Sequence, residues 1–514
     1  MICVFKIQMW KFKTGPNSAK RNNNLALFIF ILSFIAFLPF NNRGVTVHDE
    51  GFILYIADLI NRGKILYKDI LATYPPGIFL LLASIFKVFG TGIAAGRLII
   101  VFIGALISVL LYKLSSKFTN RKYALIPVIL FIVWGIPQSN IIWFSWFNLL
   151  FFLLEIYEAS KKQPSYLYIG LYAGLSLLFK QTFGAVAVIT ALLAVYNLNS
   201  RRMAKFGILV VGLLIGLLPG ILYSLFFGTG SFAFNNIVTS ALPFAKREYI
   251  FTPYPVFEPG SLFSLSFLAK KMLYWFPVVM FISSVFIYNK KNKVFLFYLI
   301  SSFLYFIAGI YPIADILHFT FVFPVVFPLS AVILSETNKW KKRIPFVIIC
   351  ISVLLIYILG IHRLVFRNYY AFEAPYFKQT QKVRIRNDNL FTDAKNAVII
   401  NTLVPQIRQL TLQNDNIFIF PYASLLYFAS ERDVPGKIVG TTKGILTLND
   451  QKEIINSLEN DKVKAVVLQI GVNDDKRSAQ DLGYTKEKLL FDYLISNFKF
   501  YSQVEDMQIR VKEN

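Results

Sequence analysis

Long apolar runs fill the first 360 residues of the chain and restrict its fold more than any other feature. Each run has about 16 to 22 residues, enough for a helix to cross the roughly 30 Å hydrocarbon core of a bilayer. Hydrophobic residues make up 56% of the chain and 52 residues are Phe, whereas soluble proteins have roughly 45–50% apolar residues. These features predict a polytopic membrane protein and exclude a soluble enzyme and a disordered chain.

The net charge of +25 belongs to the membrane half. The chain has 53 Lys and Arg against 28 Asp and Glu, but residues 361–514 hold a nearly balanced 21 and 18. The basic excess therefore flanks the apolar runs, where it reports topology rather than a nucleic-acid partner. The two cysteines, Cys3 and Cys350, offer no disulfide framework and no Cys-based zinc site.

Basic residues gather at every second polar break. The clusters are Lys6 to Arg21, Lys113 to Lys122, Lys161 with Lys162, Arg201 to Lys205, Lys290 to Lys293, and Lys339 to Arg343. If these clusters face the cytoplasm, the N-terminal tail 1–24 is cytoplasmic and the C-terminus lies outside the cell membrane. The prediction is an all-α domain over residues 25–360 with about eleven transmembrane helices. The predicted spans are 25–40, 93–113, 123–138, 143–159, 165–180, 182–198, 206–227, 271–288, 294–310, 319–335 and 344–360.

Two apolar segments can each be interpreted in two ways. Residues 76–90 would rise only ~22 Å as a helix and contain Lys87, so we interpret them as a helix in the outer interface. The first run follows a basic segment, as a signal peptide would. No A-x-A cleavage pattern follows it, and we predict an uncleaved anchor.

The acidic residues of the membrane half fall mainly on the outer side of this topology. Asp49 and Glu50 follow the first span and open an outer loop over residues 41–92. The next residues have apolar side chains at helical spacing with Asp58 on the opposite face, which predicts an amphipathic interfacial helix. Paired acids in such a loop are also common as solvated residues without a function.

The sequence of this loop resembles that of a known family. Asp49-Glu50 is followed by Gly63-x-x-x-Tyr67-x-Asp69, Tyr74-Pro75-Pro76-Gly77, Phe89-Gly90 and Arg97. Over residues 45–100 this pattern resembles the GT-C glycosyltransferases, and most of all the branch of protein O-mannosyltransferases and lipid A aminoarabinose transferases. The resemblance implies a catalytic first outer loop, many membrane helices and a C-terminal extracytoplasmic domain.

The resemblance also implies a mechanism. Family members take a sugar from a polyprenyl-phosphate donor and transfer it to an acceptor outside the cytoplasm, which is a lipid, a glycan or a protein. By resemblance Asp49 is the general base of an inverting transfer and Glu50 orients the acceptor, while Asp69 and Glu258 are further substrate-binding candidates. Related enzymes often have a basic residue just before the loop proline, where this chain has Tyr74, so the partner of the donor phosphate is open.

Outer cations and a histidine are candidates to bind substrate. Lys180 lies in the turn between two spans and Arg97 near the outer end of its helix, although either could simply reach the lipid headgroups. Asp315 and His318 form a weak metal pattern, and otherwise contact the donor or form a simple turn. No metal site is required, and the sequence leaves a divalent cation open. The predicted outer loop of residues 228–262 is rich in aromatic side chains. These side chains could form a lid over the donor or the acceptor, or they could anchor the loop in the membrane interface.

Residues 361–514 predict a small extracytoplasmic α/β domain. Short apolar strands are expected at Ile417 to Phe420, Lys437 to Val439 and Ala465 to Leu468, with a strand pair within Phe500 to Val511. Their alternation with helical patterns favours a mostly parallel sheet. The domain would cover the site or bind the acceptor.

A transporter or lipid flippase is the alternative function. Such proteins often have internal repeats and charges near the bilayer midplane. This chain has no convincing repeat, and its polar residues gather at the outer interface. These observations favour the glycosyltransferase interpretation.

Overall fold

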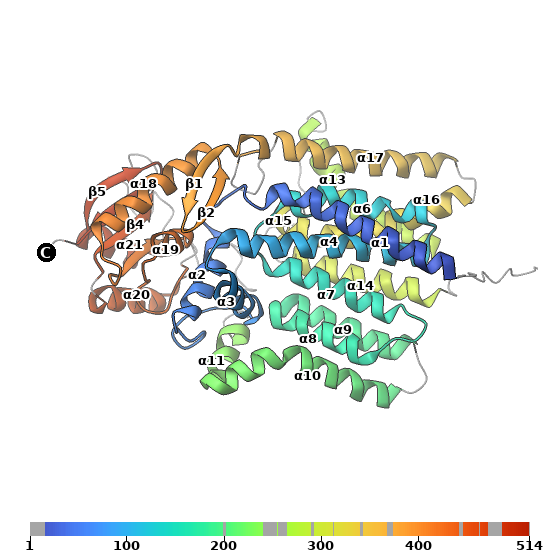
Figure 1. Ribbon diagram of the computed structural model, residues 1–514, viewed down its shortest axis with the longest axis horizontal. Helices are drawn as coiled ribbons and strands as arrows, with labels where there is room; N and C mark the ends of the chain where they lie inside the picture. The colour runs from blue at the N-terminus through green and yellow to red at the C-terminus, as the bar shows by residue number, and fades with distance from the viewer. Residues whose placement is uncertain are drawn as a thin grey trace, which may run out of the picture.

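The apolar runs form helices that lie side by side in the computed structural model (Figure 1). The structure describes residues 16–198, 202–239, 254, 265–288, 292–311, 313–339, 343–366, 374–440, 446–461, 463–470 and 486–512. The bundle consists of α1 (Pro16–Phe37), α4 (Ile93–Phe118), α5 (Arg121–Ala124), α6 (Ile126–Trp134), α7 (Phe144–Ala159), α8 (Tyr166–Phe179), α9 (Gln181–Leu198), α10 (Arg202–Phe227), α13 (Leu265–Ile287), α14 (Lys293–Ile310), α15 (Ile316–Val322), α16 (Phe327–Lys339) and α17 (Arg343–Phe366).

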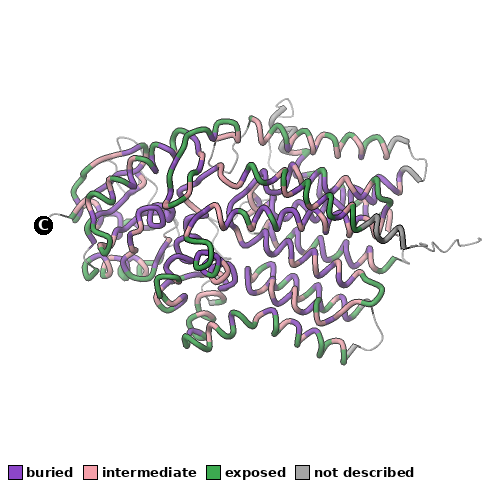
Figure 2. Tube along the Cα trace, in the orientation of Figure 1, coloured by how far each residue is buried: buried purple, intermediate pink, exposed green. Residues whose placement is uncertain are grey.

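The outer faces of the bundle are apolar. Among the described residues, six helical stretches are long and apolar enough to cross a membrane, by length and composition. In α10 and α17 most of the surface is exposed, and the exposed side chains include Leu214, Leu222, Ile351 and Leu354 (Figure 2). Exposed apolar belts of this size contact lipid rather than water. The chain is a multi-pass membrane protein, while the number of spans stays a prediction.

The two ends of the bundle differ in charge. At the end where the chain enters α1, Lys113, Lys117 and Lys161 approach the ring of Tyr157, with Lys117 Nζ 4.5 Å from its centroid. The C-terminal domain lies at the opposite end (Figure 1). The basic clusters of α4 and α7 therefore share one end of the bundle, as predicted. Which end faces the cytoplasm stays a prediction.

Helices α8 and α10 pack backbone against backbone. A Cβ atom added at Gly170 or Gly174 of α8, or at Gly212 or Gly216 of α10, would lie 2.0 to 2.5 Å from a backbone oxygen of the facing helix. Small residues at a spacing of four allow membrane helices to approach this closely. The contact fixes the turn after α8, which carries Lys180.

Two shorter helices lie where the bundle meets the C-terminal domain. They are α2 (Asp49–Asn61) and α3 (Gly77–Phe89), and they pack on each other rather than joining the long helices (Figure 1). The predicted helices in the first outer loop are therefore present. The expected solvated face of α2 is wrong, because Asp58 is 3% exposed and packs under the C-terminal domain.

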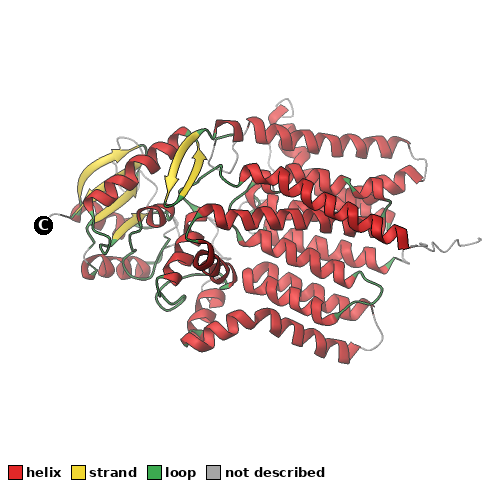
Figure 3. Cartoon of the chain, viewed as in Figure 1, coloured by secondary structure: helices red, strands yellow, loops and turns green. Residues whose placement is uncertain are grey.

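The C-terminal domain contains two small sheets (Figure 3). A hairpin of β1 (Gln381–Ile385) and β2 (Asp388–Thr392) precedes α18 (Ala394–Leu410). The larger sheet has the order β3-β4-β6-β5. Its strands are β3 (Ile417–Phe420), β4 (Ala465–Gln469), β5 (Lys499–Val504) and β6 (Met507–Val511), and its helices are α19 (Leu425–Ser430), α20 (Leu448–Asn460) and α21 (Lys488–Asn497).

Two predictions about this sheet are wrong. Only β3 and β4 are parallel among the described pairings, because β5 and β6 form a hairpin that joins β4 antiparallel. Residues 437–439 are not a strand but a connection whose Lys437 carbonyl accepts a hydrogen bond from Leu71 N–H. The strands expected at 417–420, 465–468 and within 500–511 are confirmed.

The glycine contact between α8 and α10 predicts a position-specific effect on stability. Gly212→Ala places a methyl group 2.1 Å from the Leu167 carbonyl oxygen, and such overpacking costs about 1–3 kcal/mol. We expect a lower midpoint of thermal unfolding in detergent. Gly207→Ala on the same helix is the control, because no atom lies within 4 Å of its added Cβ, and it should leave the midpoint unchanged or raise it. Equal midpoints for the two variants would contradict the close packing.

Candidate active site

A fully buried ion pair fixes the start of the first outer loop. Arg97 in α4 donates two hydrogen bonds to Glu50, from Nε at 2.8 Å and from Nη2 at 2.5 Å, and both side chains are 1% exposed. Arg97 also donates to the carbonyl oxygens of Arg43 and Gly44, and Glu50 accepts the N–H of Ile142. These bonds join three segments of the chain. They occupy Glu50 and Arg97, which the sequence had suggested as substrate-binding residues.

Asp49 is half-buried in the first turn of α2, next to Glu50. The partial positive charge of a helix N-terminus favours a carboxylate there. The side chain of Tyr422, from the C-terminal domain, lies close enough to Asp49 to interact with its charge. Burial and the charge of Asp49 raise the pKa of Tyr422 well above its ordinary value, and the same causes raise the pKa of Tyr74 to about 12. Both phenols therefore keep their protons at physiological pH, and Asp49 has two neutral hydroxyl groups nearby.

Further rings pack on Tyr74 and Tyr422, the two phenols near Asp49. Tyr74 stacks on Phe144 with ring centroids 4.3 Å apart, and Trp143 meets Tyr74 edge to face at 6.4 Å. His48 stacks on Tyr422 at 6.0 Å, and its Nδ1 donates to the Tyr422 carbonyl oxygen. Aromatic surfaces of this kind suit the apolar C–H faces of a sugar ring.

Lys180 lies beside the loop that holds Tyr74. The side chain of Gln181 donates to the Thr73 carbonyl oxygen at 2.9 Å, and a Cβ at Gly77 would lie 2.7 Å from the Leu178 carbonyl oxygen. The turn between α8 and α9 therefore packs against residues 73–77. Lys180 Nζ is 5.0 Å from the centroid of the Phe183 ring. The structure thus brings Asp49, Tyr74 and the Lys180 turn to the same end of the bundle.

The remaining candidates have local structural contacts or fall outside the described residues. Asp69 accepts the N–H of Ile65 at 2.8 Å and closes a turn. Asp315 caps α15, and it accepts hydrogen bonds at 2.8 Å from the backbone N–H and from Nδ1 of His318. Glu258 and most of the loop 228–262 lie outside the described residues. Within the described ranges, no three His, Cys, Asp or Glu side chains group closely enough to hold a metal ion.

The C-terminal domain docks directly on the first outer loop. Arg386 makes a two-pronged ion pair with Asp58 of α2, at 3.0 and 2.6 Å, and stacks over Phe428. Asp388 accepts the backbone N–H groups of Ile93 and Ala94 at the start of α4. Through these contacts the domain covers α2 and brings Tyr422 to Asp49.

Sequence reasoning did not find Tyr422 or the Asp58–Arg386 pair. One available signal was the position of Tyr422 directly after the carboxyl end of β3, an edge where α/β sheets often bind ligands. Asp58 and Arg386 lie 328 residues apart, and nothing local to either residue indicates the other.

The Glu50–Arg97 pair makes a prediction that separates a structural from a substrate-binding role. Arg97→Leu leaves Glu50 buried without its partner, which costs about 3–5 kcal/mol. We expect a large fall in the midpoint of thermal unfolding in detergent. Lys395→Met is the control, because it removes a partly exposed ion pair with Asp506, and ion pairs near the surface are worth about 0–1 kcal/mol. A normal midpoint for Arg97→Leu together with lost donor binding would instead support the substrate-binding role.

Comparisons with known proteins agree with this architecture. The family model described as dolichyl-phosphate-mannose-protein mannosyltransferase matches residues 73–223, which include Tyr74, Arg97 and Lys180. No curated protein matches the chain by sequence.

Solved structures resemble the chain over nearly its whole length. ArnT from Cupriavidus metallidurans bound to undecaprenyl phosphate has a TM-score of 0.53 and 12% identity, covering 97% of this chain and 98% of ArnT. Its apo state has a TM-score of 0.55 and 12% identity, with coverages of 96% and 97%. The archaeal oligosaccharyltransferase AglB from Archaeoglobus fulgidus, in complex with an inhibitory peptide and a dolichol-phosphate, has a TM-score of 0.53 and 12% identity, with coverages of 96% and 74%. The chain has the GT-C fold that these proteins share.

Proposed function

We propose that the chain is a membrane glycosyltransferase that moves a sugar from a polyprenyl-phosphate donor to an acceptor. The observation that carries this proposal is the carboxylate of Asp49, held at a helix N-terminus beside aromatic side chains at one end of a GT-C bundle. Two neighbours of the same fold hold undecaprenyl phosphate and dolichol-phosphate. These neighbours support a lipid-phosphate donor for this chain as well.

The proposed chemistry assigns Asp49 as general base. Asp49 takes the proton of the acceptor hydroxyl while that oxygen forms a bond to the anomeric carbon. The bond from the anomeric carbon to the phosphate oxygen breaks, and the lipid phosphate leaves with the electron pair. Attack from the face opposite the phosphate inverts the anomeric centre. The half-buried environment of Asp49 supports this role, because it limits water that would compete with the acceptor.

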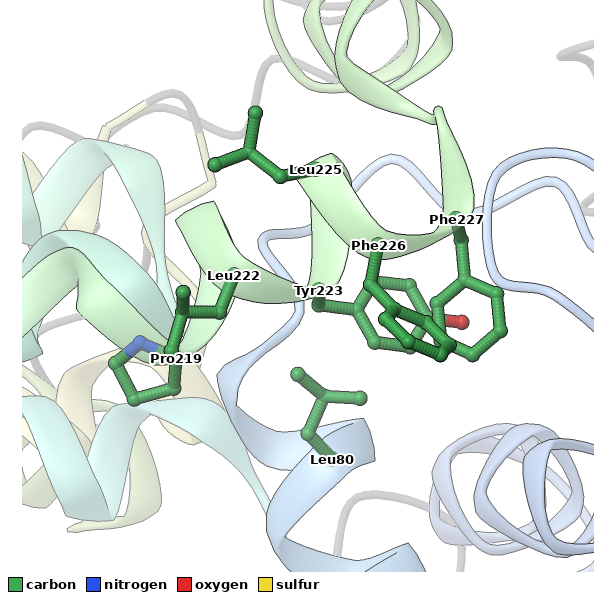
Figure 4. A pocket seen from close by; sticks show the side chains of 7 residues that line it. All are labelled: Leu80, Pro219, Leu222, Tyr223, Leu225, Phe226 and Phe227. Carbon is green, nitrogen blue, oxygen red and sulfur yellow. The ribbon is translucent and has the colours of Figure 1, made fainter.

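An apolar groove between α3 and α10 suits the isoprenoid chain of the donor (Figure 4). Its volume is about 770 Å³. It is lined by Leu80, Pro219, Leu222, Tyr223, Leu225, Phe226 and Phe227. Tyr223 connects the groove to the first outer loop, since its hydroxyl accepts the N–H of Leu66 at 2.9 Å. A lipid tail in this groove would lie alongside the loop that contains Asp69 and Tyr74.

We assign the donor phosphate to Lys180. The expected basic residue before the loop proline is Tyr74 in this chain, so another cation must stabilise the leaving phosphate. The turn of Lys180 packs on the loop of Tyr74 through Gln181 and Gly77. A lysine from this turn therefore replaces one from the loop itself.

We further infer that the site faces outward from the cell membrane. The start of α1 and the basic clusters of α4 and α7 lie at the end of the bundle opposite α2, which carries Asp49. The positive-inside rule then makes that end cytoplasmic, and the C-terminal domain extracytoplasmic.

Removing the proposed base should abolish most turnover. Asp49→Asn keeps the shape of the side chain but not its basicity, and general-base catalysis is worth about 10²–10⁴ in rate. We expect kcat to fall by that factor in proteoliposomes supplied with polyprenyl-phosphate sugars, while donor binding and the unfolding midpoint persist. Asp69→Asn is the matched control and should retain turnover, because an amide oxygen can still accept the Ile65 N–H. Near-normal turnover by Asp49→Asn would remove the base from this position.

Removing the proposed phosphate partner should weaken donor use. Lys180→Met deletes a charge-assisted hydrogen bond to the donor phosphate, and we expect the donor KM to rise about tenfold or more. Lys180→Arg should recover part of the loss, and Lys87→Met on an exposed position of α3 should have no effect. An unchanged donor KM in Lys180→Met would overturn the assignment.

A further inference from the structure

We propose that Tyr422 is a positioning residue that orients the carboxylate of Asp49. The proposal makes the C-terminal domain part of the catalytic centre rather than a cover over it. It rests on the proposed function, in which Asp49 is the base. The proximity of the two side chains, the proton on the phenol and the packing around Tyr422 support this role.

Tyr422 meets two consecutive residues of the first outer loop. Its carbonyl oxygen accepts a hydrogen bond from His48 Nδ1, and its phenol lies close enough to Asp49 to interact with that carboxylate. The rings of His48 and Tyr422 are nearly parallel, with an interplanar angle of 16°. One residue of the C-terminal domain therefore lies against the last residue before α2, His48, and the first residue of α2, Asp49.

In the hydrogen bond that we propose between the two side chains, the phenol is the donor. Burial and the nearby carboxylate raise the pKa of Tyr422 well above its ordinary value, so the phenol keeps its proton and donates. A donor on one carboxylate oxygen restricts rotation of the Asp49 side chain and directs the other oxygen toward a bound hydroxyl. Asp49 alone, half-exposed at a helix start, would sample several rotamers.

Close packing on both sides fixes the position of Tyr422. A Cβ at Gly440 would lie 3.2 Å from Tyr422 Cε2 and 3.5 Å from Phe52 Cδ2. Just after Tyr422 in the sequence, Leu425 N–H donates to the Val47 carbonyl oxygen at 3.1 Å. A Cβ at Gly51 would lie 2.2 Å from Leu425 N, so the two backbones touch there. These contacts hold the backbone that carries Tyr422 against the start of α2.

The test removes one oxygen atom. Tyr422→Phe keeps the ring and its stacking on His48 but deletes the donor to Asp49. We expect kcat to fall about 10- to 100-fold, since small errors in the placement of a reacting group cost this much, with little change in donor KM or unfolding midpoint. The double variant with Asp49→Asn should be no slower than Asp49→Asn alone, because the two side chains act as a unit.

Tyr427→Phe is the matched control. Tyr427 is a buried phenol of the same domain that stacks on Tyr55, and its hydroxyl accepts from the backbone N–H of Ile419. Its loss should lower the unfolding midpoint without a selective fall in kcat. A purely structural role for Tyr422 would give the same pattern in both variants and would overturn the proposal.

The outcomes also separate this inference from the proposed function. Normal kcat in Tyr422→Phe with an inactive Asp49→Asn rejects the role of Tyr422 alone. An active Asp49→Asn rejects the base itself. If Tyr422→Phe does not fold, ring-fluorinated tyrosine at position 422 keeps the shape with a more acidic hydroxyl. The stronger hydrogen bond should make Asp49 a weaker base and lower kcat, and an unchanged kcat would overturn the proposal.

Discussion

The buried ion pair of Glu50 and Arg97 determines the geometry of the end of the bundle that meets the C-terminal domain. Two charges at 1% exposure are tolerable only when nearly every hydrogen-bonding group around them is satisfied, and here they bind each other, two loop carbonyls and the N–H of Ile142. Three segments that are distant in sequence meet at this point. The direction in which α2 leaves the bundle, and with it the position of Asp49, depends on this pair.

The C-terminal domain adds further contacts that hold the start of α2 in place. Its hairpin adds main-chain hydrogen bonds to the segment before α2, between Phe391 and both Asn42 and Gly44. Val383, Leu390, Ile417 and Ile419 belong to the same buried cluster as the apolar side chains of α2. Part of the domain therefore shares a core with the membrane helices, while Phe418, Leu458 and Leu490 belong to a separate cluster within the domain. The candidate site lies at the junction of the domain and the helices.

The sequence contains most of what is periodic in this structure. Apolar runs predicted the helices, and charge predicted that the basic ends of α4 and α7 lie together. The family resemblance of residues 45–100 indicated where to look for the candidate site. Local pattern could not show which side chains pair over hundreds of residues. Asp58 has the spacing of a solvent-facing residue and is buried only because Arg386 covers it. The alternation of strands with helices predicts a mostly parallel sheet. It is wrong for β5 and β6, because strand patterns carry no information about the direction of the partner strand.

The contact between His48 and Tyr422 joins residues 374 positions apart, one near the beginning and the other near the end of the chain. At synthesis rates of about 5–20 residues per second, roughly 20 to 75 seconds separate the two. During that interval the membrane helices around Asp49 exist without the phenol that binds it. The arrangement described for Asp49 is therefore a property of the finished chain, and a ribosome-bound or prematurely ended product has the carboxylate without its partner.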